Sequence, residues 1–140
     1  MGRSETRENL FKLIYEQCII EEKNALTYSI VEKATEEAQR EYLTKVYAGV
    51  NENLDFLKSC IARFSDDFSI ERIYKVDLSI LLLACYEILY MDEVPDAAAI
   101  NEAVNLSKKY STEKSSAFIN GILASIKKNK EVILHEREDN

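Results

Sequence analysis

Hydrophobic residues recur every three or four positions along most of the chain, which is the spacing of amphipathic α-helices. The first apolar stripe includes Leu10 and Ile14 and predicts a helix over about residues 4–21. Ser4 is suited to cap the start of this helix, because a serine side chain can accept a hydrogen bond from a free backbone N–H. Charged residues of this segment, Arg7 among them, fall mostly off the stripe and are expected on an exposed face.

The middle of the chain predicts two further helices. Ile30 and Ala34 belong to a four-residue repeat that favours a short helix over about residues 30–39. A longer apolar stripe follows and predicts one helix over about residues 40–64. Gly49 lies inside it, and a glycine in the interior of a helix usually marks close contact with another helix.

The second half of the chain begins with a helix that is apolar on nearly every side. This pattern over about residues 76–91 indicates a helix enclosed by others rather than one on the surface. Pro95 ends it, because the residue before a proline is pushed out of the helical region. Two more helices are expected over about residues 97–110 and 116–130, and residues 136–140 are expected to form a frayed tail.

Together these segments predict a compact all-α bundle of about six to seven helices. The chain has 140 residues, which corresponds to one domain over residues 1–140. It contains only three glycines and one proline, and this scarcity of chain breakers favours long helices over many short strands. Neither internal repeats nor strand-like alternation is evident.

The charge and the cysteines restrict the function. The formal net charge is -7, so contact with nucleic acid would need a local basic patch or a basic partner. Three separated cysteines and a single histidine do not match a zinc site, and buried free thiols in a reducing cytosol are the natural interpretation. The N-terminus has no secretory signal core. The apolar run over residues 78–91 is shorter than the roughly 20 residues of a membrane span.

Candidate chemistry is sparse. A Gly-rich phosphate loop and a Ser-His-Asp order are both absent, so an enzyme is not favoured and no cofactor is expected. Arg3 and Arg7 lie four residues apart and would share one face of the first helix. Phe118 falls at the edge of an apolar stripe; if exposed, it could stack on an unpaired RNA base, although a place at the rim of the core is the simpler interpretation.

Three blocks in the second half resemble the NusB family of bacterial transcription antitermination factors. The blocks are Val-Asp-x-x-Ile-Leu-x-x-Ala-x-Tyr-Glu-Ile-Leu followed by Asp-x-Val-Pro, then Ala-Ile-Asn-Glu-Ala-Val-x-Leu-x-Lys, then Ser-x-x-Phe-Ile-Asn-Gly-Ile-Leu. They occur in this order between Val76 and Leu123. A weaker match at Arg3 to Tyr15 is similar to the first helix of that family.

The resemblance implies an all-helical fold of two small bundles and a function without catalysis. It implies binding to the single-stranded box A element of nascent RNA, notably in ribosomal RNA operons. It further implies pairing with the ribosomal protein NusE and, through that complex, an indirect association with the elongating RNA polymerase. A cytoplasmic protein is expected, without membrane contact.

Carried over residue by residue, the resemblance assigns two sets of positions. Those expected to contact RNA are Arg3, Arg7, Glu71, Lys114 and Phe118. Asp77 matches an acidic position of the NusE contact surface. The arginine cluster that opens the family's first helix is reduced here to two residues, whereas Lys114 adds positive charge where family members often carry an acidic residue.

Two alternatives remain open from the sequence. The first is a similar RNA-recognition domain that works apart from antitermination, for example in ribosome assembly. The second is a helical protein-interaction scaffold or homodimer without an RNA role, which the reduced arginine cluster favours.

Overall fold

A computed structural model describes residues 2–66 and 69–138, and in these ranges the chain forms eight α-helices and one 3-10 turn. In chain order they are α1 (Arg3–Ile20), α2 (Ala25–Ala34), α3 (Glu37–Glu52), α4 (Leu54–Arg63), η1 (Ile70–Arg72), α5 (Lys75–Tyr90), α6 (Asp96–Tyr110), α7 (Glu113–Lys128) and α8 (Lys130–Glu138). No strand occurs in the described ranges, and the predicted all-α class is confirmed.

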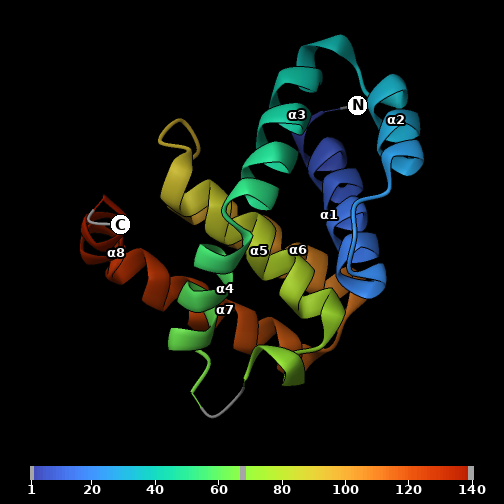
Figure 1. Cartoon of the computed structure of the whole chain (residues 1–140). Helices are drawn as coiled ribbons and strands as arrows, with labels where there is room; N and C mark the ends of the chain where they lie inside the picture. The colour runs from blue at the N-terminus through green and yellow to red at the C-terminus, as the bar shows by residue number, and fades with distance from the viewer. Residues whose placement is uncertain (1, 67–68, 139–140) are drawn as a thin grey trace.

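Helix α5 is the centre of the molecule. Of its 16 residues 13 are buried, as the apolar sequence predicts. Helices α1, α3, α4, α6 and α7 all pack against it. In Figure 1, α1 to α3 gather at the upper right of the molecule, α4 and α7 lie at the lower end and α8 at the left, with α5 between them. Each fully buried leucine or isoleucine in this core contributes about 1.5–3 kcal/mol of transfer free energy.

The single helix expected over residues 40–64 is wrong: the segment forms two helices, α3 and α4, which meet at Asn53. The Asn53 side-chain amide donates a hydrogen bond to the Gly49 carbonyl at 2.8 Å. Its side-chain oxygen accepts a hydrogen bond from the Tyr90 hydroxyl at 3.0 Å. These two bonds hold the Asn53 side chain at the point where the chain changes direction, as Figure 1 shows.

The boundaries of the first helices also differ from expectation. Ser4 is not the N-cap of α1, because the helix already begins at Arg3 with Gly2 as its cap residue. The short helix is α2, which begins at Ala25 and not near residue 30. Its cap is Asn24, whose side-chain oxygen accepts hydrogen bonds from two backbone N–H groups of the first turn.

The expected frayed tail is a helix through Glu138, and residues 139–140 lie outside the described residues. Helix α8 is held because Ile133 is buried against the core. In addition, the Arg137 guanidinium lies 4.4 Å from the centre of the Tyr90 ring. These contacts connect the end of the chain to the end of α5 and bring the helix count above the predicted six to seven.

Gly49 marks a close helix contact, as the sequence predicts. A Cβ atom added at this position would lie 2.2 Å from the ring of Tyr86 on α5. Tyr86 is itself buried and stacks on Tyr90, with ring centroids 4.8 Å apart. Gly49 therefore lets α3 approach α5 to a distance that a larger residue would prevent.

We predict that Gly49→Ala lowers the free energy of unfolding by about 1–3 kcal/mol, because the added methyl group displaces the packed Tyr86 ring. Gly121→Ala is the matched control, since a Cβ there would meet nothing within 4 Å. Removing that exposed helical glycine should raise stability by about 0.5–1 kcal/mol. Urea denaturation of both variants measures the two effects, and equal effects would contradict the close contact.

Candidate functional site

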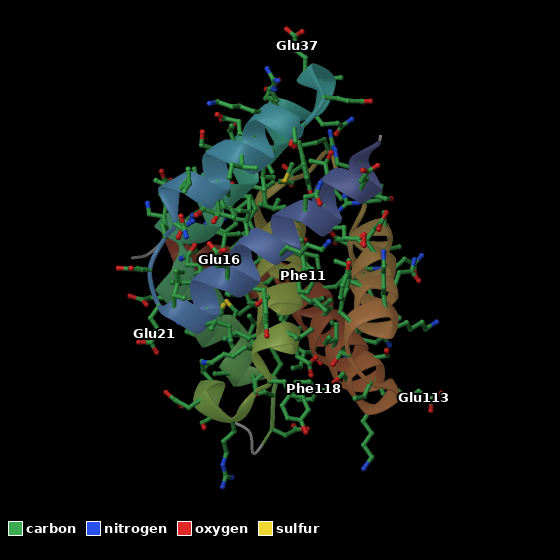
Figure 2. The ribbon with its side chains drawn as sticks, turned by 90° about the vertical axis from the view of Figure 1, so that its right-hand side faces the viewer. Phe11, Glu16, Glu21, Glu37, Glu113 and Phe118 are labelled. Carbon is green, nitrogen blue, oxygen red and sulfur yellow. The ribbon has the colours of Figure 1, made fainter. Side chains whose placement is uncertain are left out.

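An open groove lies where the N-terminal ends of α5 and α7 meet η1. Its volume is about 780 Å³, and residues that line it include Arg72, Tyr74, Asp77, Lys114 and Phe118. Figure 2 shows Phe118 at the lower end of the molecule, between α7 and the segment that carries η1. Three of the residues expected from the resemblance are thus brought together here from two separate parts of the sequence.

Asp77 forms the floor of this groove and is only 3% exposed. Its carboxylate accepts hydrogen bonds from the hydroxyl groups of Ser111 and Ser115, each at 2.7 Å. The side-chain oxygen of Thr112 in turn accepts a hydrogen bond from the Ser115 backbone N–H and caps α7. Asp77 therefore ties the start of α5 to the turn between α6 and α7 and sets the relative position of the groove walls.

The walls of the groove carry both aromatic and charged groups. Phe118 is half-buried and packs against the core, whereas Tyr74 is 68% exposed. The side chains of Arg72, in η1, and Lys114, in α7, are exposed at the groove. Glu71 is exposed in η1 beside Arg72 but does not itself line the groove.

Arg3 and Arg7 lie far from this groove, at the N-terminal end of α1. Figure 2 places that end of α1 near Glu37, opposite Phe118. The Arg3 side chain donates a hydrogen bond to Gln39 at 2.7 Å, and its guanidinium lies 4.0 Å from the centre of the Tyr42 ring. The structure therefore does not bring the two arginines and Phe118 into one continuous patch.

Arg7 is buried, so the expectation of an exposed face for this residue is wrong. It is 6% exposed, and its Nε and Nη2 donate to the two carboxylate oxygens of Glu87 at 2.9 and 2.8 Å. Its Nη1 lies 3.1 Å from a carboxylate oxygen of Glu102. Burial alone would lower the pKa of Arg7, but hydrogen bonding to Glu87 and the charges of both glutamates outweigh it and raise the pKa above its usual value.

Sequence reasoning missed the acidic partners of Arg7. Glu87 is a single charged residue inside the apolar run of α5. A buried carboxylate needs a cationic partner, so this residue could have predicted an ion pair from the sequence. Glu102 lies on α6, and only the fold brings it to Arg7. Tyr74 and Arg72 were missed as groove residues because only the fold brings η1 and the start of α5 against α7.

The cysteines provide no metal centre in the part of the chain that the structure describes. Over residues 2–66 and 69–138, no group of three or more His, Cys, Asp or Glu side chains could hold a metal ion. Cys60 and Cys85 are buried and Cys18 is half-buried. Hydrogen bonding between the two buried thiols lowers the pKa of Cys60 and raises that of Cys85. Among the helices of the described residues, none has both the length and the hydropathy of a membrane span.

The protein is an all-helical bundle with an open groove at one end, and cations and aromatic rings line this groove. These features place it in the class of all-helical binding domains. The model of the NusB family matches residues 4–128. With most of its length matched, the chain belongs to the NusB family.

Known proteins support this assignment. The transcription antitermination protein NusB of Acetivibrio thermocellus is 42% identical over 130 residues, which cover 91% of this chain and 90% of that protein. The protein of the same name from Ruminiclostridium cellulolyticum is 37% identical, with the same coverage. The solved structure of T. maritima NusB is 30% identical, with a TM-score of 0.83 over 91% of this chain and 92% of that one.

A chain from the crystal structure of antitermination factors NusB and NusE in complex with dsRNA shares the fold. It has a TM-score of 0.80 and 24% identity over 91% of this chain and 98% of that chain. At this identity the comparison bears on the fold alone.

We predict that Arg7→Met lowers the free energy of unfolding by about 3–5 kcal/mol, because it leaves the Glu87 carboxylate buried without its partner. Lys45→Met is the control, since Lys45 pairs with Glu93 on the surface at 3.3 Å and an exposed pair contributes about 0–1 kcal/mol. The double variant Arg7→Met with Glu87→Leu should recover much of the loss. If Arg7→Met costs no more than Lys45→Met in urea denaturation, the buried ion pair does not stabilise the fold.

Proposed function

We propose that this protein is a transcription antitermination factor that binds unpaired box A RNA together with the ribosomal protein NusE. In this role it acts in the cytoplasm as a binding factor, not an enzyme, and reaches the elongating RNA polymerase through the complex. Membership of the NusB family and the names of the curated relatives support the proposal.

The observation that carries the RNA role is the groove between α5 and α7. The aromatic ring of Phe118 can stack on an unpaired base, and the nearby Lys114 can contact a phosphate.

The other residues expected to contact RNA lie outside the groove. Arg3 is half-buried at the N-terminal end of α1, away from the groove, where it would add a second, distant phosphate contact. Burial of Arg7 argues for an indirect role, in which it holds α1 in place rather than touching RNA. Glu71 would lie near RNA at the edge of the groove.

An acidic chain gains RNA affinity when a basic partner shares the RNA. We propose that NusE fills this role and that Asp77 belongs to its contact surface. The Asp77 carboxylate is already bonded to two serines, so its contribution would combine negative potential with the ordering of the α6–α7 turn.

A protein-interaction scaffold or homodimer without an RNA role is the second candidate. One observation favours it: α2 exposes Leu26 and Ile30, one turn apart, to 72% and 61%. Sedimentation velocity over a range of protein concentrations tests self-association, and Leu26→Glu with Ile30→Glu should abolish any dimer formed through this face. A concentration-independent monomer would exclude the homodimer.

The test of the RNA role is fluorescence anisotropy of a labelled box A RNA at two salt concentrations, with and without NusE. Salt-sensitive binding that strengthens with NusE and fails for a scrambled RNA is the expected result. Binding to box A without any effect on termination in a reconstituted transcription assay would favour a role apart from antitermination, such as ribosome assembly. Absence of binding under all conditions would overturn the RNA role.

We predict that Phe118→Ala weakens box A binding by about 1–3 kcal/mol through loss of stacking. Phe118→Leu is the control for packing, because leucine retains apolar volume against the core but cannot stack as an aromatic ring. Both variants should weaken binding while Phe118→Leu keeps a near-normal thermal midpoint. If Phe118→Leu binds RNA as tightly as the unmodified protein, Phe118 serves packing and not stacking.

We predict that Asp77→Asn weakens NusE pairing about tenfold, equivalent to about 1.4 kcal/mol, because it removes the charge with little change in size. Asp92→Asn is the matched control: it makes the same substitution in an exposed residue just beyond the other end of α5. Isothermal titration calorimetry with NusE measures both. Equal affinities for the two variants would remove Asp77 from the contact surface.

A further inference from the structure

We propose that the groove holds two unpaired RNA bases and not one, with Tyr74 as the second stacking surface and Arg72 as a second phosphate contact. This inference rests on the proposed RNA-binding function and adds two residues to it. It assigns to Tyr74 and Phe118 one base each, and to Arg72 and Lys114 the phosphates beside those bases.

Two aromatic residues from different elements line the one groove. Tyr74 lies at the junction of η1 and α5, whereas Phe118 lies in the second turn of α7. The two rings differ in their surroundings, since Phe118 packs partly against the core and Tyr74 is 68% exposed. Successive bases of single-stranded RNA are commonly held on successive aromatic side chains of one surface. The volume of about 780 Å³ lies within the range of about 300–1,000 Å³ that is typical of ligand sites.

Each of the two cations comes from the same segment as one of the rings. Arg72 immediately precedes the Ile73–Tyr74 segment, and Lys114 lies one helical turn before Phe118. Tyr74 and Thr112 are the cap residues of α5 and α7, so the positive ends of both helix dipoles also face this region. Each segment therefore carries an aromatic ring and a positive charge, which matches the alternation of base and phosphate along a strand.

The acidic groups limit how basic this groove can be. Glu113 lines it and Glu71 lies next to Arg72, while the carboxylate of Asp77 on the floor is bonded to Ser111 and Ser115. Two cations against these acids do not create a strongly positive surface. Stacking is therefore expected to supply most of the affinity of the groove for RNA. The two phosphate contacts together should contribute only about -1.4 to the slope of log K against log salt for single-strand binding.

The experiment uses the full chain with NusE and box A RNAs in which single positions carry 2-aminopurine, whose fluorescence changes when it stacks. Two positions should respond when the complex forms. Tyr74→Ala should abolish the response at one position and leave the other, which Phe118→Ala should abolish instead. Each substitution should weaken binding by about 5- to 150-fold, the range expected for loss of one base stack. Tyr74→Phe retains an aromatic ring and should bind normally.

Salt dependence tests the cations. Arg72→Gln should reduce the slope of log K against log salt by about 0.7, the loss of one phosphate contact on a single strand. Lys127→Gln removes the same kind of charge from the exposed far end of α7 and should leave the slope unchanged. Equal slopes for these two variants would overturn the role of Arg72.

The outcomes separate this inference from the function on which it rests. If the unmodified protein with NusE does not bind box A RNA, the proposed function fails. If it binds, and Phe118→Ala weakens binding while Tyr74→Ala does not, the second stacking surface is wrong and the function stands. If Tyr74→Ala weakens pairing with NusE without changing any 2-aminopurine response, Tyr74 contacts the protein partner and the two-base groove is overturned.

Discussion

The ion pair between Arg7 and Glu87 is the interaction on which the arrangement of the helices depends. Glu87 lies in α5, a helix enclosed on nearly every side, where a carboxylate without a partner would be strongly unfavourable. Arg7 meets it with two hydrogen bonds from α1 and also reaches Glu102 on α6. One guanidinium thus connects three helices, α1, α5 and α6.

The same enclosed helix creates the candidate site at its other end. Where α5 begins, Asp77 is bonded to the α6–α7 turn and Tyr74 emerges into solvent beside α7. The groove is therefore built on helix ends that the core holds firmly, and a site on rigid elements loses little entropy on binding. Its few cations agree with a net charge of -7, because such a protein depends on local contacts and on a partner for RNA affinity.

Patterns that concern one helix at a time were predictable. The enclosed α5, its end before Pro95 and the close approach at Gly49 all follow from residue types at helical spacing. The division of α3 from α4 was not, because apolar spacing continues through Asn53, and the contact of its side chain with the distant Tyr90 appears only in the fold. Helix α8 was missed for a similar reason: its short polar sequence is ordered by the burial of Ile133 against other helices.

The sequence by itself determined the all-helical class, the family and the presence of Phe118, Lys114 and Asp77 among the candidates. Only the tertiary structure decided which of these residues share a surface. Arg3 and Arg7 have the same side chain four residues apart, yet Arg3 is half-buried against Tyr42 and Arg7 is inside the core. Helical spacing specifies which residues share a face, but the identity of the helix that covers that face depends on packing between segments far apart in the chain. Arg7 lies inside the core because it bonds there to the buried carboxylate of Glu87, which is 80 positions away in the chain.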